Sequence, residues 1–577
     1  MWRPLTDAEI SQLIQQNNFS DDWKNISVVL DFSAMHIRDC RFYGPIRLEN
    51  GVTLLNSTLS NYHIGTGTRI ANVRNMVFTH ERYAYPLELC NEDGRYRVNA
   101  VPGMNSTDAF LCLHTGNPDL FGQGAVDEHM GRIGAGCNIE NIDCIDHLHT
   151  GDGCELSGCA KVSHAWISSS AEQSTRIGKG VFLDHVIVNE GARIDTAANL
   201  AHVLVGQCCS LTDGARIYHS AIGDNSHIAG CEIGHSFLYP CHEQHHSNSF
   251  LIAAHVQGQS NVAAGATLGS NHNGRKNDVD LVAGRGFWPG LCTSLSYPCS
   301  FAPYTLIAKG DYPRPLRIPF AFSLINNNIQ DNCLEIMPAF WWMHNAYAMM
   351  RNEWKYEHRD KRKNYTQQYD YRPLAPDTIH VVMENHRLLT RHLAGEAELP
   401  KMEMSNRPVR ILKENEAVAA YREMMLCYVL RNSRTFEDKP LQLNAILSEP
   451  DEQWVNAGGN VISAKHLHEL SQAASLKECH TLQGQYSDEY YSDGDTRFIL
   501  RYLCGGEVTE ARIRALHVEA IAAQVRFYER VIAERKRDLS SEFRQTNTMF
   551  PSPSPDIFDD PICQQAATEI ARVHTLT

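Results

Sequence analysis

A six-residue pattern with histidine at its third position recurs through the middle of the chain. Each of six copies has an aliphatic residue two positions before the histidine, and all but the first have another three positions after it. Successive histidines are 17, 21, 17, 17 and 16 residues apart. They are His147, His164, His185, His202, His219 and His235. A repeat this short predicts a coil that stacks upon itself.

The aliphatic residues of this region also follow a fixed spacing. From Ile177 to Leu238 they recur at every fifth or sixth position, so three steps make one turn of the repeat. An amphipathic helix would space them three or four apart, and an isolated strand two apart. Short strands that pair with the coils above and below, about 4.8 Å away, do explain the spacing. The sequence therefore predicts a parallel β-helix.

The same rhythm sets the expected domain boundaries. We expect a helical lead-in over residues 1–27 and the β-helix over 28–318, with an inserted lobe at 79–130 where the rhythm stops and turn signals such as Asn91-Glu-Asp-Gly94 appear. Residues 319–577 are expected to be mainly helical, because helical spacing recurs there. The expected helices cover 331–364, 377–397, 409–432 and 507–543.

Composition excludes several classes of protein. The formal charge of −15 argues against a general nucleic-acid binder, which needs a basic surface. We find no secretory signal segment and no run of about 18 apolar residues, so we expect no membrane span and a cytoplasmic protein. The 18 cysteines lack CxxC spacing and are expected to be reduced thiols.

Glycine often follows the aliphatic residue of the repeat, as in Ile177-Gly178 and Ile222-Gly223. With this feature the repeat resembles the hexapeptide-repeat family, whose members form left-handed β-helices and trimeric acyltransferases. The resemblance implies a left-handed coil and a homotrimer. The inserted lobe and the long helical region are absent from simple acetyltransferases of this kind. The whole chain resembles instead a long bacterial member catalogued as a domain of unknown function.

The coil period breaks between residues 242 and 303, where polar residues are densest. In the acyltransferases that the repeat resembles, a histidine takes a proton from a sugar hydroxyl or amine while an acyl thioester is attacked. Imidazole suits this step because its pKa is near neutrality. His272 is the first candidate for this base and His246 the second. The alternative is that both histidines hold loops through hydrogen bonds.

Other polar residues of the same interval are candidates for binding the acceptor. Asn271 and Arg275 flank His272 and could orient a sugar or a phosphate. Asp278, Arg285 and Trp288 are further candidate substrate contacts.

The end of the coil, from Tyr304 to Pro313, resembles the last coil of sugar and amino-sugar O-acetyltransferases. In those relatives this region borders the groove for coenzyme A, and the lysine can meet phosphate oxygens. The resemblance implies that Lys309 contacts a coenzyme A thioester, which is the expected donor. No tightly bound cofactor is expected.

No metal is expected, because zinc sites usually pair ligands from two separate places and only one cluster is evident. His242, His245 and His246 are the residues that would hold one. The six repeated histidines should lie one strand spacing apart and titrate as a coupled set. We interpret them as corner residues whose rings cap backbone groups; the alternative is a ladder that binds anions or a metal.

Two functions follow from these observations. The first is an acyltransferase that uses an acetyl-CoA-type donor and acts on a sugar, a sugar phosphate or a nucleotide sugar. The second is a non-catalytic β-helical scaffold or ligand-binding protein whose helical region recruits a partner.

Overall fold

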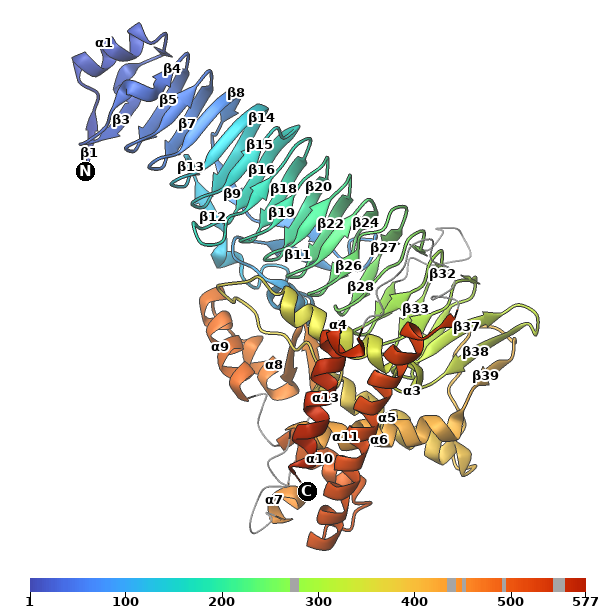
Figure 1. The fold of residues 1–577 in the computed structure, drawn as a ribbon. Helices are drawn as coiled ribbons and strands as arrows, with labels where there is room; N and C mark the ends of the chain where they lie inside the picture. The colour runs from blue at the N-terminus through green and yellow to red at the C-terminus, as the bar shows by residue number, and fades with distance from the viewer. Residues whose placement is uncertain (270–279, 433–442, 449–452, 490–493, 543–555, 577) are drawn as a thin grey trace.

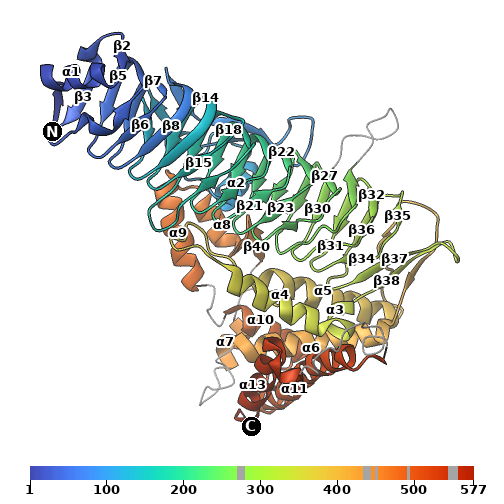
Figure 2. The same ribbon diagram turned by 45° about the horizontal axis from the view of Figure 1, so that its top comes forward.

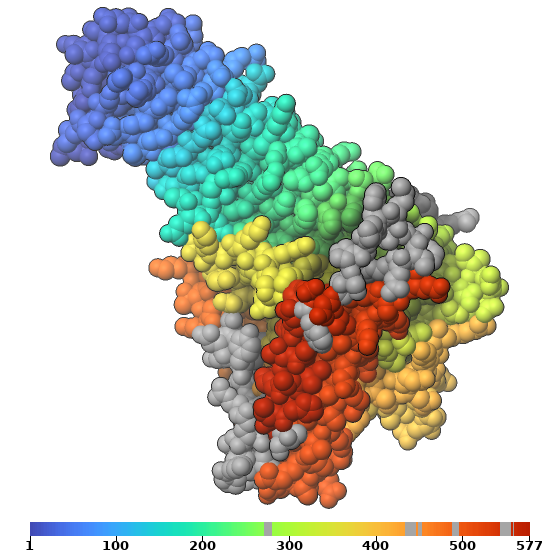
Figure 3. Space-filling view, in the orientation of Figure 1, coloured from blue at the N-terminus to red at the C-terminus, as the bar shows by residue number. Residues whose placement is uncertain are grey.

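A long parallel β-solenoid forms the main body of the chain, and a helical region packs along its later coils (Figure 1, Figure 2). The computed structural model describes residues 1–269, 280–432, 443–448, 453–489, 494–542 and 556–576. The first coils project beyond the helical region (Figure 3). Within the described residues no helix is both long and apolar enough to cross a membrane.

Each coil contributes short strands that pair in parallel with strands of the neighbouring coils, while β1 (Trp2–Pro4) runs antiparallel to β3. Helix α1 (Asp7–Gln15) lies at the start of the solenoid. The strands before the inserted lobe are β2 (Phe19–Ser20), β3 (Ile26–Val29), β4 (Ile37–Arg38), β5 (Arg41–Leu48), β6 (Thr53–Leu55), β7 (Thr58–Ile64) and β8 (Arg69–Val77). Those after it are β13 (Gly131–Ile133), β14 (Asn138–Thr150), β15 (Glu155–Ser157), β16 (Lys161–Ile167), β17 (Arg176–Ile177), β18 (Phe182–Val188), β19 (Arg193–Ile194), β20 (Asn199–Val205), β21 (Ser210–Thr212), β22 (Arg216–Ile222), β23 (His227–Ala229), β24 (Glu232–Gly234), β25 (Phe237–Leu238), β26 (Glu243–Gln244), β27 (Phe250–Ile252), β28 (Ala254–Val256), β29 (Thr267–Gly269), β30 (Leu281–Ala283), β31 (Trp288–Pro289), β32 (Ser294–Ser296), β33 (Cys299–Phe301), β34 (Leu306–Ile307), β35 (Asp311–Tyr312) and β36 (Leu316–Ile318).

The periodic aliphatic residues stack on one another inside the coil. Ile177 pairs with Ile194, and Leu183 pairs with Leu200, which pairs in turn with Ile217 on the next coil. All five side chains are buried. The structure confirms that the spacing read from the sequence describes parallel strands stacked into a coil.

The six repeated histidines form a column at one corner of this coil, which we call the histidine ladder. Their φ angles lie between 43° and 55°, a left-handed conformation that histidine, asparagine and aspartate adopt more readily than most residues. Consecutive rings are nearly parallel, with centroids 4.5–5.0 Å apart. The expected spacing of one strand is confirmed.

The inserted lobe lies against the histidine ladder. Its elements are β9 (Glu81–Tyr83), β10 (Tyr85–Glu88), β11 (Arg97–Ala100), α2 (Ser106–Thr115) and β12 (Val126–Glu128). Strand β9 pairs with β12, so the two ends of the insertion meet at its neck.

The C-terminal region is mainly helical and begins with a small sheet. β37 (Leu324–Asn328) and β38 (Cys333–Met337) form an antiparallel pair that prolongs the coil, and β39 (Val409–Ile411) joins it. The helices predicted from residues 331 and 409 therefore begin later, because these segments pair with the last coil strands instead. The helices are α3 (Phe340–His344), α4 (Ala346–Arg359), α5 (Pro376–Leu393), α6 (Glu414–Asn432), α7 (Leu443–Ser448), α8 (Ala464–Leu470), α9 (Leu476–Glu489), α10 (Gly494–Leu503), α11 (Glu510–Leu539) and α13 (Pro561–His574), with the hairpin β40 (Trp454–Ala457) and β41 (Asn460–Ser463).

Buried ion pairs join the helical region to the coil. Arg362 lies 3.0 Å from Asp224, and Arg285 of the coil lies 2.8 Å from Asp377 at the start of α5. All four side chains are less than a tenth exposed. Removing one partner of such a pair leaves a buried charge uncompensated, so these contacts fix the helical region against the coil.

Truncation of one stacked aliphatic residue tests the coil directly. We expect Leu200→Ala to destabilise the protein by about 2–5 kcal/mol, because Leu200 is fully buried between Leu183 and Ile217. The change should appear as a lower urea midpoint. Asn199→Ala, on the same strand but exposed, is the matched control and should leave the midpoint nearly unchanged. Equal effects of the two variants would contradict this packing.

Candidate functional site

In the described part of the later coils, the solenoid has three corners, and two of them are covered. The ladder corner lies under the inserted lobe. The second corner, at Gln207 and Asn225, lies under the segment that follows α4: Gln207 donates to the backbone oxygen of Asn364 at 2.9 Å, and Asn225 to Asp360 at 2.8 Å. The third, which we call the open corner, follows the short strands β17, β19, β21, β23, β26, β31 and β34. Its residues Lys179, Ala197, Asp213, Asn248 and Lys309 are exposed.

Two residues predicted from the sequence lie on this open corner. His246 follows β26 by two residues, and Lys309 follows β34 by two residues; both are exposed. Backbone contacts connect the coil of Glu243 to that of Asn261, then to those of Trp288 and Leu306. His246 and Lys309 are therefore three coils apart, which is three strand spacings of about 4.8 Å, or roughly 14 Å.

His246 lies beside a stacked pair of histidines, with its ring tilted by 46° to that of His245. Its ring centroid lies 4.5 Å from that of His245, which stacks on His227 at 4.7 Å. Burial lowers the pKa of both His245 and His227. Burial thus favours the neutral form of the His245 and His227 imidazoles.

Helix α4 places two positively charged side chains next to β26, the strand that precedes His246. Lys355 and Arg359 lie 2.7 Å and 2.9 Å from the buried carboxylate of Glu243. These two cations are not predicted from the sequence, because more than a hundred residues separate them from Glu243 and no local pattern indicates the contact.

The histidines named as metal ligands serve other purposes. His242 is buried, with Nδ1 2.8 Å from Ser260 and Nε2 3.1 Å from Gln244, and burial lowers its pKa to about 4. The carboxylate of Glu243 forms ion pairs with Lys355 and Arg359. Among the described residues, the clusters that bring three ligand-type side chains together lie elsewhere.

The remaining predicted residues lie away from the open corner or outside the described residues. Arg285 is buried and donates to the backbone oxygens of Asp370 and Arg372 as well as to Asp377. Trp288 packs on Trp341 of α3, with ring centroids 5.6 Å apart.

Four predicted residues, His272, Asn271, Arg275 and Asp278, lie outside the described residues. The strands on either side, β29 and β30, pair with β27 and β28, which meet at the ladder corner.

The seam between the ladder and the lobe is a second concentration of titratable groups. Nδ1 of His164 lies 2.6 Å from Glu81, Nε2 of His147 lies 2.9 Å from the hydroxyl of Thr79, and Nδ1 of His235 lies 3.0 Å from the backbone oxygen of Glu88. Two of these histidines contact backbone groups, because Nε2 of His147 also accepts from the backbone N–H of Thr79 at 3.4 Å. The expected contacts with backbone groups thus occur at His147 and His235, and the rings of the ladder also stack on one another and receive the lobe.

Titration along the ladder is spread out, in the direction expected for coupled groups. The hydrogen bond to Glu81 raises the pKa of His164. Burial, with neighbouring histidines adding to it, lowers the pKa of His185 and brings that of His219 to about 4.

A cavity of about 710 Å³ lies in the helical region, away from the coil. It lies between α6 and α11, next to Trp342 of α3. Its carboxylate Glu423 accepts from the indole N–H of Trp342 at 2.6 Å and from Arg526 at 2.8 Å. This volume falls in the range of small-molecule sites.

Comparison with known proteins assigns no activity. The family model described as "Domain of unknown function (DUF4954)" matches residues 49–393. An uncharacterized protein of Treponema pallidum (strain Nichols) is 34% identical over 575 residues, an alignment that spans 84% of this chain and 79% of the relative.

The lowered pKa of His219 predicts that the folded protein loses stability in acid. Its folded pKa of about 4 is below the unfolded value of about 6.5, so its contribution to stability is complete above pH 6.5 and is lost as pH falls toward 4. His164 has the opposite sign, since a raised pKa adds stability below pH 6.5. We expect His219→Asn, which tolerates the left-handed corner, to reduce the fall in Tm between pH 7 and pH 4.5.

The matched control is His36→Asn, an exposed histidine near the start of the coil. It should leave the pH profile of Tm as it is in the unmodified protein. Parallel profiles for His219→Asn and the unmodified protein would refute the role assigned to the ladder.

Proposed function

We propose that this chain, which belongs to the DUF4954 family of domains of unknown function, transfers an acyl group from a coenzyme A thioester to a sugar-type acceptor at the open corner. The observation that carries the proposal is the placement of His246, the second candidate base, and Lys309, the candidate coenzyme A contact, on the same exposed corner of the described later coils. The expected acceptors are sugars, sugar phosphates and nucleotide sugars, and the phosphates of the last two would be attracted by the nearby cations Lys355 and Arg359.

The reaction needs one general base for the acceptor hydroxyl and one cation that binds a phosphate of the donor. The acceptor hydroxyl attacks the thioester carbonyl carbon while the imidazole of His246 takes the hydroxyl proton. The carbon–sulfur bond then breaks, and the thiolate takes a proton and leaves as coenzyme A. The Lys309 ammonium binds a phosphate of the donor as a point charge. His245 and His227 support His246 through their stack.

The proposal includes a left-handed coil of the hexapeptide-repeat type, a homotrimer and a cytoplasmic location. The open corner is the surface at which a second copy would complete the donor groove. Light scattering of the purified protein tests the trimer independently of the chemistry.

Binding of the donor can be separated from turnover. We expect millimolar acetyl-CoA and free coenzyme A to raise Tm in the unmodified protein, because a ligand that binds only the folded state stabilises it. Lys309→Ala should abolish this rise. Lys179→Ala is the matched control, because Lys179 is also exposed on the open corner and lies between two glycines on an earlier coil. Absence of protection in the unmodified protein would overturn the proposal.

Turnover is measured by release of the coenzyme A thiol with a panel of sugars, sugar phosphates and nucleotide sugars. We expect His246→Ala to lower kcat by about 10²- to 10⁴-fold, the usual contribution of a general base, while protection by coenzyme A remains. His272→Ala is the parallel variant: loss of turnover there, with His246→Ala unaffected, would transfer the role of base to His272.

A second candidate function is binding of a small molecule without catalysis, and the cavity in the helical region favours it. Its polar lining includes Arg422, Glu423 and Arg526 among apolar residues such as Ala419 and Leu426. A chain that shows no protection by coenzyme A, but whose Tm rises with a metabolite and no longer does so in Ala419→Trp, would establish this alternative.

A further inference from the structure

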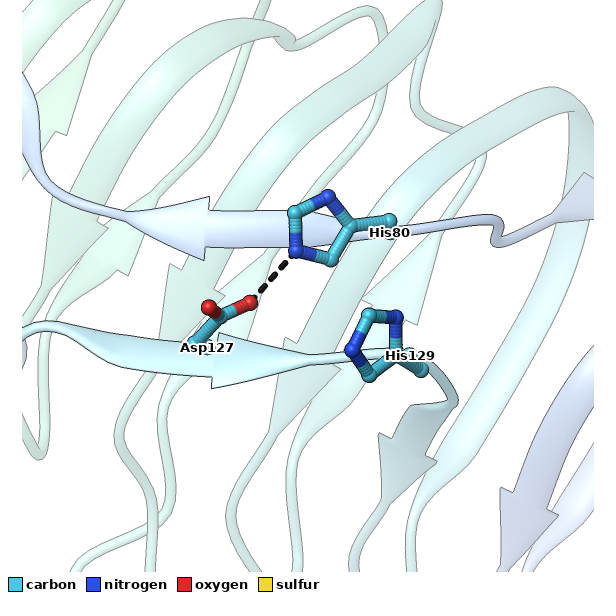
Figure 4. A group of neighbouring side chains, drawn as sticks. All are labelled: His80, Asp127 and His129. Atoms are coloured by element: carbon cyan, nitrogen blue, oxygen red, sulfur yellow. Dashed lines mark hydrogen bonds and ion pairs between the residues drawn. The ribbon is translucent and has the colours of Figure 1, made fainter.

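The neck of the inserted lobe carries two histidines and an aspartate on one face. Strands β9 and β12 are antiparallel, with Glu81 opposite Glu128 and Arg82 opposite Asp127. One step further, His80 comes opposite His129. Because side chains alternate along a strand, Asp127 lies on the same face as His129, two residues away. Figure 4 shows the three side chains gathered at this neck.

Their polar atoms are close enough to share one ion. Nε2 of His80 lies 2.5 Å from Oδ1 of Asp127, and the rings of His80 and His129 stack with centroids 4.6 Å apart. One ligand atom from each of the three lies within 4.8 Å of the others. With bonds of about 2.0–2.2 Å to a common tetrahedral ion, ligand atoms lie about 3.4 Å apart, so His80 and Asp127 must separate slightly while His129 stays within reach.

The ligand set indicates the kind of ion. Two imidazoles and one carboxylate suit zinc or a related first-row transition metal, whereas calcium and magnesium prefer oxygen ligands throughout. All three residues are exposed, so an ion could enter without opening the fold, and water could complete its coordination.

A simple surface ion pair explains less of the arrangement. An exposed pair such as His80 and Asp127 contributes only about 0–1 kcal/mol, and it gives His129 no role. Two stacked imidazoles repel each other when both are protonated. A divalent ion takes the place of those protons and holds the two rings and the carboxylate together.

We propose that His80, Asp127 and His129 bind a divalent first-row transition metal ion that joins the two ends of the inserted lobe. His80 precedes the first strand of the lobe and His129 follows its last, so the ion closes the insertion at its neck. On the opposite face of β9, Glu81 binds His164 of the ladder. The ion therefore stabilises the strand that docks the lobe on the coil.

The test uses the full chain after removal of metal with a chelator. Zinc is titrated by isothermal calorimetry, and cobalt provides an independent readout through its visible absorption. We expect one equivalent to bind and to raise Tm. His80→Ala and His129→Ala should each weaken metal binding by more than roughly tenfold. Loss of a residue that only hydrogen-bonds to a metal ligand already lowers metal affinity by about tenfold or more. Both variants should also abolish the rise in Tm.

Two controls locate the ion. His114→Ala changes an exposed histidine elsewhere in the lobe and should leave one equivalent bound. His164→Asn removes a member of the other histidine-containing cluster, Glu81, His147 and His164, and should also leave it bound. The proposal would be overturned if His164→Asn lost the bound metal ion while His129→Ala kept it. Weak metal binding that no variant changes would also overturn it. Circular dichroism confirms that each variant is folded.

Discussion

The corner at which the chain turns through a left-handed residue is the constraint on which the other features depend. A φ angle near +50° costs an ordinary L-residue about 1–2 kcal/mol, and the coil repeats this turn at each of six histidines. Glycine would turn more easily, but it would leave no side chain at the corner. Histidine tolerates the turn and offers a ring that stacks on the next coil. The column of rings then forms a flat apolar edge with polar atoms at its rim.

The covering of this edge decides which part of the coil is accessible. Tyr85 of the lobe packs edge-on against His185, and Glu81 pairs with His164, so the lobe holds the ladder corner. The second corner is held from the other side by buried charges, of which Arg362 with Asp224 is the most enclosed. Two different interactions, aromatic stacking and ion pairing, therefore leave the same third corner exposed. Among the described residues of these covered coils, a ligand reaches the coil most directly at that corner.

The sequence predicts the coil because its signal is local and repeated. Every inward residue, such as Leu200, has an equivalent one turn away at Ile217, and the structure stacks the two. The lobe is predicted only as an interruption, since nothing in its sequence says which corner it covers. Arg285 illustrates the limit most clearly. It was predicted as a substrate contact from a polar neighbourhood, yet its guanidinium pairs with Asp377, which lies 92 residues away. Without knowledge of the fold, a charged side chain that forms an ion pair with a distant part of the chain cannot be distinguished from one that binds a ligand.

The metal site at the neck could have been read from the sequence in part. Asp127 and His129 show the two-residue spacing that places side chains on one face of a strand, but their partner His80 lies at the other end of the insertion. Pairing of β9 with β12 is what brings them together, and its register is fixed from both faces. A shift by one residue would turn His80 toward the ladder and Glu81 toward solvent, so that the pair with His164 and the cluster at the neck would be lost together. The ion site and the docking of the lobe are thus two consequences of one strand register.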